Sequence, residues 1–272
     1  MLQLVPTPIG NIGDISLRAI EALSSADILL CEDTRVTKKL LHILKERFNT
    51  TFKENQTFIS MHSHNEKEFL TGIDKTIFEK NVVYVSDAGM PGISDPAQLL
   101  VKYCQDNYIE YDVLPGANAI LCAFVASGFV ETRMLFWGFL PHKGHDRAAS
   151  LQGALNSGYT TVLYESIHRL EKLLDELDKE AKDRKLFVAK ELTKKYQKYY
   201  FGVAKDIKES LKNEELKGEW VVVIEASQAQ NSSAITKSDI MELDLPKKVQ
   251  AKLISKITGE NTKLCYERLL KC

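Results

Sequence analysis

The stretch VVYVSDAGMPGISDP, residues 82–96, decides the fold of this chain. It begins with an apolar run, Val82 to Val85, that is typical of a buried parallel strand. It continues into a loop that holds glycine, proline and aspartate, after which Asp95 and Pro96 fit the N-cap and the first position of a helix. A strand, a glycine-containing loop and a helix, in this order, form the place where α/β sheets bind small ligands.

Two other stretches repeat this pattern of strand, turn and helix. One reads LVPTPIGNIGDIS, residues 4–16, and the other reads VLPGAN, residues 113–118. In a parallel sheet the three loops would meet at the carboxyl edge and surround a common ligand. These loops lack the GxGxxG spacing of dinucleotide-binding folds and the lysine of a P-loop, so the sequence supports neither a standard dinucleotide fold nor an NTPase.

Strand-like and helical patterns alternate through the first half of the chain. Five such alternations predict a parallel sheet with helices on both faces. We therefore expect an N-terminal α/β domain over residues 1–126, followed by a linker at 127–133. The expected strands are 2–5, 28–31, 57–61, 82–86 and 111–114, and the expected helices are 16–24, 37–45, 66–79, 96–105 and 117–126.

In the second block strands outnumber helices, so its sheet is expected to be mixed. This block predicts a second α/β domain over residues 134–227. A polar linker at 228–233 then leads to a small helical, locally basic tail over residues 235–272. The expected strands are 135–139, 160–164, 186–189, 199–202 and 220–224, and the expected helices are 147–155, 167–177, 204–211, 237–243, 246–257 and 262–270.

The composition is typical of a cytoplasmic α/β protein. The chain has 272 residues, enough for two domains of ordinary size, and 44% of them are hydrophobic. No apolar run is long enough to span a membrane, and the chain starts directly with a strand pattern rather than a signal peptide. The five cysteines show no CxxC pair and no metal-ligand spacing, and Cys31 and Cys122 are expected to be core residues. A net charge of −1 argues against a broad basic surface but allows a local basic groove.

Short motifs occur in a defined order along the chain. They are PTPIGN (6–11), EDTR (32–35), HSHNE (62–66), SDAGMP (86–91), GFLP (138–141), YESIHRL (164–170), KELTK (190–194) and KGE (217–219). The ordered set resembles the RsmI family of bacterial small-subunit ribosomal RNA 2′-O-methyltransferases, which belongs to the tetrapyrrole methylase superfamily. The resemblance runs from Leu4 to the C-terminal helices and is weakest in the tail.

The resemblance implies two α/β domains of the tetrapyrrole methylase type, with S-adenosyl-L-methionine bound in the cleft between them. Backbone groups of the 86–92 loop and the ends of two strands in the second domain are expected to hold this methyl donor. The alternative for these glycine and proline residues is turn geometry alone. The implied donor-binding residues are Pro8, Gly10, Ser86, Asp87, Ala88, Gly89, Gly92, Ile93, Pro115, Gly116, Ala117, Leu140, Tyr164, Glu165, Ser166, Glu191, Leu192 and Thr193.

Polar residues after the second and third strands are candidates for the acceptor side. Arg35 can bind an RNA phosphate bidentately, and either His64 or Glu32 can serve as the base that assists removal of a hydroxyl proton. The sequence leaves the choice of base open, and Asp33 fits a helix cap. Methyl transfer from a sulfonium donor requires no metal, so we expect no metal site.

Cations in two parts of the chain are candidates for RNA contacts. In the first part they lie close in sequence to tyrosines at 196, 199 and 200, a mixture that suits unstacked RNA, although an exposed β-hairpin has a similar composition. In the second part they begin the basic tail, for which a solvated face is the alternative. The candidate RNA-binding residues are Arg169, Lys190, Lys194, Lys195, Lys247 and Lys248.

These features together predict a cytoplasmic enzyme that methylates the 2′-hydroxyl of a ribose in 16S ribosomal RNA, a decoding-centre cytidine by resemblance. The expected partner is the small ribosomal subunit, and the resemblance also implies a homodimer. One alternative is a methylase of a small tetrapyrrole-like acceptor, and another is a noncatalytic ribosome-assembly factor that keeps the donor fold. The helical tail and the lysine–tyrosine segment favour RNA over a small acceptor, and the intact glycine loops argue against a noncatalytic protein.

Overall fold

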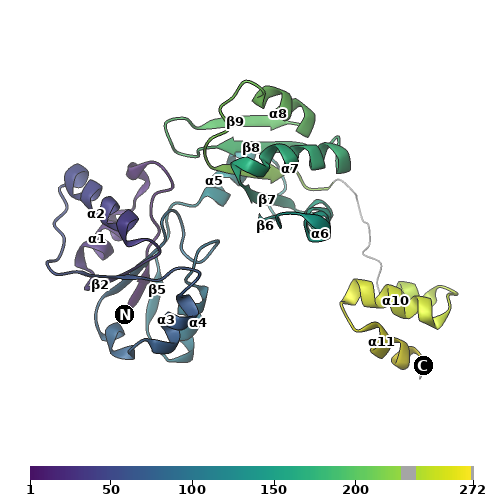
Figure 1. Ribbon diagram of the computed structural model, residues 1–272, viewed down its shortest axis with the longest axis horizontal. Coiled ribbons are helices and arrows are strands. Elements are labelled where there is room, and N and C mark those ends of the chain that lie inside the picture. The colour runs from purple at the N-terminus through teal and green to yellow at the C-terminus, as the bar shows by residue number, and fades with distance from the viewer. Residues whose placement is uncertain (228–236, 271–272) are drawn as a thin grey trace. The chain divides into compact units, whose positions relative to one another are not determined.

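The first half of the chain folds around a five-stranded parallel sheet, as the computed structural model in Figure 1 shows. The structure describes residues 1–227 and 237–270. The strands lie in the order β3-β2-β4-β1-β5, and every residue of β2 and β4 is buried. Because all neighbouring strands are parallel, the loops that follow them lie at one edge, which confirms the sequence prediction. The strands are β1 (Leu2–Leu4), β2 (Ile28–Cys31), β3 (Thr57–Ser60), β4 (Val82–Val85) and β5 (Tyr111–Val113).

Helices cover both faces of this first sheet (Figure 1). Side chains of α1 and α2 pack on one face, and side chains of α3 and α4 pack on the other. Successive residues of β4 alternate between the two cores, so Val83 and Val85 face one and Val82 and Tyr84 face the other. The helices are α1 (Leu17–Ser25), α2 (Thr34–Phe48), α3 (Glu66–Gly72) and α4 (Gln98–Asp106), with 3-10 helices at Ile12–Asp14 and Lys75–Glu79.

The second sheet is mixed, as the excess of strands predicted. Its order is β6-β7-β10-β8-β9, in which β6 and β7 are parallel and the remaining pairs are antiparallel. Three amphipathic helices, α6, α7 and α8, bury their leucines and isoleucine against one face. These elements are β6 (Met134–Phe139), α6 (Gly144–Leu155), β7 (Thr160–Glu165), α7 (Ile167–Glu180), β8 (Leu186–Lys190), β9 (Lys198–Gly202), α8 (Ala204–Leu211) and β10 (Trp220–Ile224).

The opposite face of the second sheet is covered by α5 (Ala119–Ser127), which follows directly after β5. Ile120 and Ala123 of this helix share a core with strands β7, β8 and β10, and Ile9 from the N-terminal loop joins the same core. The helix that we placed last in the first domain therefore packs against the second sheet. Cys122, predicted to be a core residue, is exposed on α5, so that prediction was wrong.

The start of α4 also differs from the sequence prediction. The helix begins at Gln98, two residues later than expected, and Ala97 at its N-cap position has φ +136°. The buried Glu66 carboxylate accepts a hydrogen bond from the Ala97 N–H at 3.1 Å, and so replaces the cap that Asp95 was expected to form. Asp95 is thereby left free to face a cavity.

The C-terminal segment forms a compact unit of its own, Ser227–Cys272, apart from the unit Met1–Ala226. Its three helices are α9 (Lys237–Glu242), α10 (Lys247–Thr258) and α11 (Thr262–Leu269), and a small apolar core holds them together. Gly259 ends α10 in the left-handed conformation, with φ +72°. The predicted linker at 228–233 lies outside the described residues. Within 1–227 and 237–270, no helix is long and apolar enough to cross a membrane.

Candidate active site

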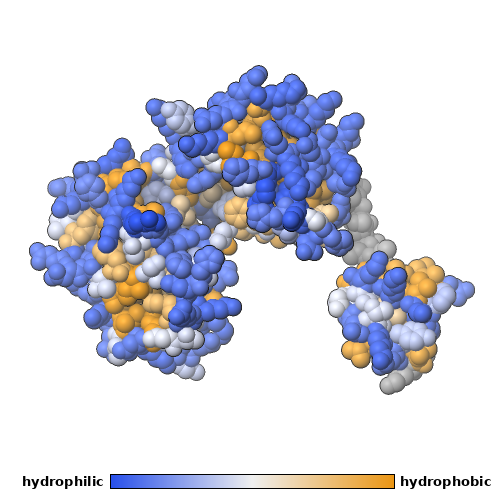
Figure 2. All heavy atoms as spheres, in the orientation of Figure 1, coloured by the Kyte–Doolittle hydropathy of each residue, from blue (hydrophilic) through white to orange (hydrophobic). Residues whose placement is uncertain are grey.

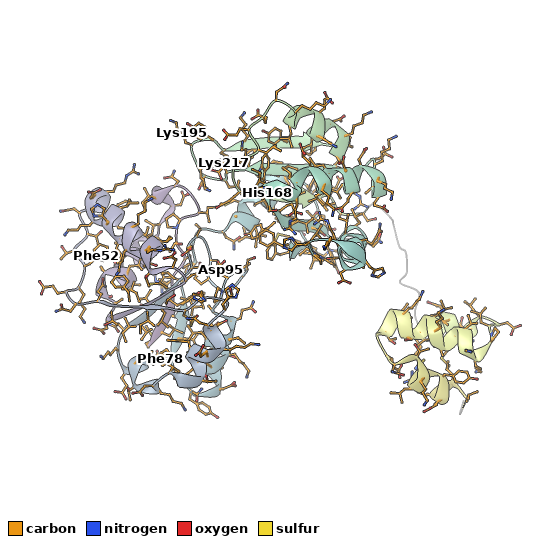
Figure 3. All side chains as sticks on the ribbon, in the orientation of Figure 1. Phe52, Phe78, Asp95, His168, Lys195 and Lys217 are labelled. Atoms are coloured by element: carbon orange, nitrogen blue, oxygen red, sulfur yellow. The ribbon has the colours of Figure 1, made fainter. Side chains whose placement is uncertain are left out.

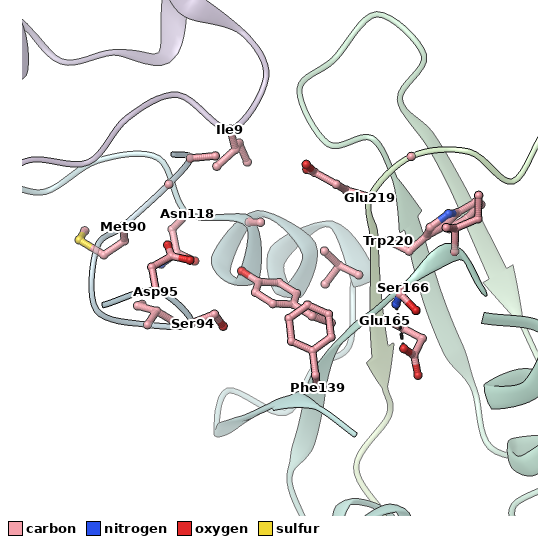
Figure 4. A pocket seen from close by; sticks show the side chains of 18 residues that line it. Ile9, Met90, Ser94, Asp95, Asn118, Phe139, Glu165, Ser166, Glu219 and Trp220 are labelled. Carbon is pink, nitrogen blue, oxygen red and sulfur yellow. Dashed lines mark hydrogen bonds between the residues drawn. The ribbon is translucent and has the colours of Figure 1, made fainter. Parts of the chain in front are cut away.

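A cavity of about 420 Å³ lies between the loop after β4 and the second sheet (Figure 4). This volume is within the range of sites that hold a small molecule or cofactor. Apolar side chains form most of the wall, and polar groups occur at a few places. The lining residues are Ile9, Ala88, Gly89, Met90, Ile93, Ser94, Asp95, Asn118, Ala119, Phe139, Tyr164, Glu165, Ser166, Ile167, Gly218, Glu219, Trp220 and Val221.

On the side of the first sheet, Gly89 fixes the position of the wall. Its N–H and C=O exchange hydrogen bonds of 3.0 Å each with Thr7, which ties the loop after β4 to the loop after β1. Gly89 has φ +83°, and a Cβ atom placed on it would lie 3.2 Å from Ile9 Cγ2. Because Thr7 uses the backbone polar groups of Gly89, the backbone groups open to a ligand here are those of Ala88, which has no hydrogen bond within the described chain.

Two carboxylates hold the same loop against the loop after β2. Glu32 Oε2 accepts a hydrogen bond from the Asp87 N–H at 3.1 Å, and Asp87 Oδ1 accepts one from the Asp33 N–H at the same distance. Burial raises the pKa of Asp87, and the neighbouring Glu32 raises it further. These two hydrogen bonds hold the loop after β4 in place. Neither carboxylate lines the cavity, so their negative charge lies behind its wall.

Asp95 brings a carboxyl group to the cavity itself (Figure 4). Burial raises the pKa of Asp95 to about 6, and the charges of Glu32 and Asp87 contribute to the increase. Across the cavity, burial and the nearby Asp95 raise the pKa of Tyr164 to about 12, so its phenol stays protonated at neutral pH. Sequence reasoning missed Asp95 as a site residue because its position before Pro96 fitted a helix cap equally well.

On the side of the second sheet, Glu165 is the centre of a buried ionic network. Its carboxylate lies 3.3 Å from Arg147 Nη2 and 2.8 Å from Arg169 Nη2, and it accepts the Ser166 N–H at 2.8 Å. The same two arginines donate to the carbonyl oxygens of Pro141 and Leu140, at 3.1 and 2.9 Å. This network holds the end of β6 beside the start of α7.

The helices α5 and α7 both begin at this cavity. Asn118 caps α5 by accepting the Leu121 N–H, and Ser166 precedes α7. The N-terminus of a helix carries partial positive charge and favours an anionic group nearby. The cavity therefore combines an acidic wall at Asp95 with two helix ends that suit a carboxylate.

A strained loop borders the cavity beside Glu219. Glu191 Oε1 accepts the Glu219 N–H and lies 2.9 Å from Lys194 Nζ, which also lies 3.1 Å from Glu219 Oε2. Glu191 and Thr193 have φ values of +52° and +63°, a left-handed conformation that costs about 1–2 kcal/mol for each such residue. Gly218 is required because a Cβ atom there would lie 2.7 Å from Glu191 Cγ.

The loop after β1 contacts this strained loop directly. The Asn11 N–H donates to Thr193 Oγ1 at 3.1 Å. A Cβ atom on Gly10 would lie 2.7 Å from Thr193 Oγ1 and 3.0 Å from the Leu192 carbonyl oxygen. Gly10 therefore permits close approach between two loops rather than contact with a ligand.

The predicted donor-binding residues divide into two groups. Six of them line the cavity: Ala88, Gly89, Ile93, Tyr164, Glu165 and Ser166. The others support the cavity from outside or lie elsewhere. For example, Gly116 packs against Pro6, because a Cβ atom added to Gly116 would lie only 2.6 Å from Pro6 Cβ. Gly92 lines a separate, shallower depression. The twelve residues that do not line the cavity are Pro8, Gly10, Ser86, Asp87, Gly92, Pro115, Gly116, Ala117, Leu140, Glu191, Leu192 and Thr193.

The candidate acceptor residues lie at the carboxyl edge of the first sheet but outside the cavity lining. The guanidinium of Arg35 is 89% exposed and pairs with Asp33, which caps α2. This pairing lowers the pKa of Asp33 to about 2. His64 is exposed, with its ring centroid 6.0 Å from that of His62.

Two of the predicted RNA contacts, Arg169 and Lys190, are engaged inside the protein, and a third, Lys194, forms ion pairs with Glu191 and Glu219. Arg169 is held by Glu165 and Leu140, and its side chain is 14% exposed. Lys190 is buried, donates to the Glu215 carbonyl oxygen and lies over the ring of Trp220. We therefore withdraw Arg169 and Lys190 as RNA contacts. Lys195 remains exposed, and Figure 3 shows it projecting from the loop that contains Lys194.

The cavity fits S-adenosyl-L-methionine, the donor that the motifs imply. Apolar walls suit the adenine and thioether portions, and the free Ala88 backbone groups suit ribose hydroxyls. The two helix ends suit the donor carboxylate, and Asp95 places negative charge where a sulfonium cation would be stabilised.

The chain is similar to known proteins in both sequence and fold. Residues 1–208 match the family model described as Tetrapyrrole (Corrin/Porphyrin) Methylases. The ribosomal RNA small subunit methyltransferase I of Campylobacter fetus subsp. fetus is 47% identical over 99% of this chain and 100% of its own length. The solved methyltransferase CobJ has a TM-score of 0.59 at 18% identity, covering 85% of this chain and 95% of its own. The uroporphyrin-III C-methyltransferase of Thermus thermophilus, in complex with S-adenosylhomocysteine, has a TM-score of 0.53 at 14% identity, covering 82% and 96%.

Proposed function

Because the chain belongs to the ribosomal RNA small subunit methyltransferase I family of tetrapyrrole methylases, we propose that it methylates the 2′-hydroxyl of a ribose in 16S ribosomal RNA. S-adenosyl-L-methionine supplies an activated methyl group as a sulfonium. The chain must therefore position donor and acceptor and remove the hydroxyl proton. The proposed target is a decoding-centre cytidine, and the proposed location is the cytoplasm, where ribosomal subunits are found.

The cavity is the observation that carries this proposal. It lies where the Gly89 loop of the first sheet meets the Tyr164-Glu165-Ser166 segment of the second, so one bound donor contacts both halves of the protein. Gly89 and Gly218 have positive φ values at its border, and the buried Glu165 network fixes its far wall. The open cavity, together with 47% identity to a ribosomal RNA small subunit methyltransferase I, favours an enzyme over a noncatalytic assembly factor.

An RNA acceptor has exposed groups available outside the cavity. Arg35 and His64 lie at the carboxyl edge that borders the cavity, and Lys195 and Tyr196 are exposed on the loop beyond Lys194. In the C-terminal unit, Lys247 and Lys248 are exposed at the start of α10. We assign the phosphate contacts to these cations, because phosphate neutralisation positions RNA on a protein without reading its sequence.

We further propose that the protein forms a homodimer through an apolar edge of the second sheet. β9 is an edge strand of that sheet, and its Phe201 is 61% exposed. The ring centroids of Phe201 and Phe129 are 6.0 Å apart. Val125 and Val130 nearby in the chain are 77% and 97% exposed. Figure 2 shows several apolar patches within a mostly hydrophilic surface. Light scattering of Phe201→Lys against wild type tests this: an unchanged mass would overturn the proposed edge.

Methylation of isolated small ribosomal subunits tests the proposed reaction. Subunits from a strain that lacks this protein are incubated with the purified chain and isotope-labelled S-adenosylmethionine. Mass spectrometry of nuclease fragments should find one added methyl group on a ribose, resistant to alkaline cleavage, in a single 16S fragment. Label on a base, or on no RNA fragment at all, would refute the proposal. Gly89→Val is the matched inactive control, because its side chain fills the donor wall.

A further inference from the structure

We propose that Asp95 is the general base that removes the proton from the acceptor hydroxyl. This assignment rests on the proposed ribose methylation and names a residue that the motifs did not select for this role. Asp95 belongs to the loop between β4 and α4 and lines the donor cavity together with Ser94 and Met90. In Figure 3 it lies on the side of the first sheet that faces the second sheet, and Figure 4 shows its carboxyl group at the cavity beside Asn118.

The other acidic and basic groups near the cavity are already engaged. Glu32 accepts the Asp87 N–H, Glu165 is enclosed by two arginines, and Glu219 pairs with Lys194. His64 does not line the cavity. By contrast, no ion pair among the described residues involves Asp95. Asp95 is therefore the carboxylate that faces the cavity with its charge uncompensated.

A buried hydroxyl lies beside Asp95, behind the cavity lining. Ser86 is 2% exposed, and its hydroxyl interacts with the Asp95 carboxyl and lowers the pKa of Asp95, against the larger effect of burial. Asp95 is thus the part of this pair that the cavity exposes, and Ser86 lies behind the lining.

The surroundings of Asp95 suit a base that works near neutral pH. The titratable groups that act on it or respond to it are Glu32 at the end of β2, Asp87 beside it, Tyr84 in β4 and Tyr164 in β7. Burial and the charges of Glu32 and Asp87 favour proton uptake by Asp95, and the Ser86 hydroxyl opposes it more weakly than burial favours it. With a pKa of about 6, Asp95 is ionised at neutral pH and still accepts a proton more readily than an ordinary aspartate.

The O–H bond of the ribose 2′-hydroxyl breaks, and its proton passes to a carboxyl oxygen of Asp95. The electron pair left on the 2′-oxygen forms the new O–CH₃ bond, while the C–S bond of the donor breaks and its pair stays on sulfur, which becomes a neutral thioether. Asp95 then returns its proton to water. Before methyl transfer, the Asp95 carboxylate also stabilises the binding of S-adenosyl-L-methionine, whose sulfonium is cationic, over that of S-adenosylhomocysteine, whose thioether is neutral.

Asp95→Asn tests the proposal because it keeps the shape of the side chain and removes its charge. Glu219→Gln is the matched control, since it neutralises a second carboxylate of the same cavity. Single-turnover methylation of small subunits is measured across pH, and calorimetry gives the affinities for S-adenosylmethionine and S-adenosylhomocysteine. The wild-type rate should rise with pH to a plateau above about 6. Asp95→Asn should lower the plateau rate by about a hundredfold or more and abolish this rise.

The binding measurement gives a readout that does not depend on catalysis. Asp95→Asn should lower the preference for the cationic donor over the neutral product by about fivefold, and Glu219→Gln should change it less. If Asp95→Asn keeps the wild-type rate and pH profile, the assignment of Asp95 as the base is wrong, and the proposed ribose methylation is unaffected. If the wild type transfers no methyl group to RNA, the proposed function fails, and an unchanged binding preference would then also remove Asp95 from the donor site.

Discussion

Replacing Glu165 by Gln should destabilise the second α/β domain strongly. Gln keeps the size of the side chain but removes the charge that lies between Arg147 and Arg169, where the Glu165 carboxylate is completely buried. Removing one partner of a buried ion pair typically costs 3–5 kcal/mol, because the other charge is left without compensation. Arg147 keeps Glu176 at 2.9 Å, and Arg169 keeps the Leu140 carbonyl oxygen. We therefore expect the lower end of that range, about 3 kcal/mol.

Intrinsic fluorescence measures this loss directly. The chain has two tryptophans, Trp137 and Trp220, and both lie in the second sheet, so their signal follows the domain that Glu165 stabilises. For the compact unit Met1–Ala226, to which this domain belongs, about 3 kcal/mol corresponds to a fall in the thermal midpoint of about 6–12 °C. Glu176→Gln is the control: its carboxylate is 27% exposed, and we expect a loss of about 1 kcal/mol or less. Equal midpoints for the two variants would refute the assignment of Glu165 as the centre of the network.

Three other tests probe separate parts of the structure: a pair of glycine substitutions, a pair of lysine reversals and Asp95→Asn. Gly89→Ala and Gly128→Ala should each cost about 1–2 kcal/mol, because both positions have positive φ. Calorimetry should show weaker donor binding only for Gly89→Ala, whose Cβ would meet Ile9, and equal donor affinity in both variants would contradict this. Reversing Lys247 and Lys248 to Glu should reduce the salt dependence of RNA binding by about one to two units of slope and leave donor binding unchanged; an unreduced slope would assign both lysines to a solvated face. Asp95→Asn should stabilise the protein at pH 7. Since the folded pKa is raised, the wild type loses stability as pH rises from about 4 to about 6, by about 1 kcal/mol after solvent screening, and a urea titration in which the variant shows the same loss would contradict the shift.

The secondary structure could be predicted closely from the sequence, because local patterns determine it. The buried strand Val82–Val85 and the apolar run of β10 have the composition of central strands, and all expected strands in the described chain were found within one or two residues of their bounds. The start of α4 was misplaced because Asp95 and Pro96 satisfy the local rules for a helix start. The competing cap comes from Glu66, about thirty residues earlier in the chain, and no local pattern reveals that contact.

The site could be predicted only in outline for the same reason. Motif order identified the Gly89 loop and the Tyr164 segment, both of which line the cavity. Whether a cation is free to bind RNA depends on its partners in space: Arg169 reaches the Leu140 carbonyl oxygen, 29 positions away, and Lys190 reaches Glu215. Such long-range pairs turn expected surface cations into internal supports, and the one-dimensional sequence does not show them.

The packing of α5 decides where this chain can be divided into fragments. A cut at the apparent boundary near residue 127 would separate α5 from the second sheet and leave the core face of β8 and β10 uncovered. Such halves would expose apolar surface and aggregate. A cut between β5 and α5, near residues 114–116, keeps the helix with the sheet it covers and breaks only the Pro-Gly turn. Two fragments made there should reassemble when they are expressed together, and the donor, whose contacts lie on both fragments, would favour their association.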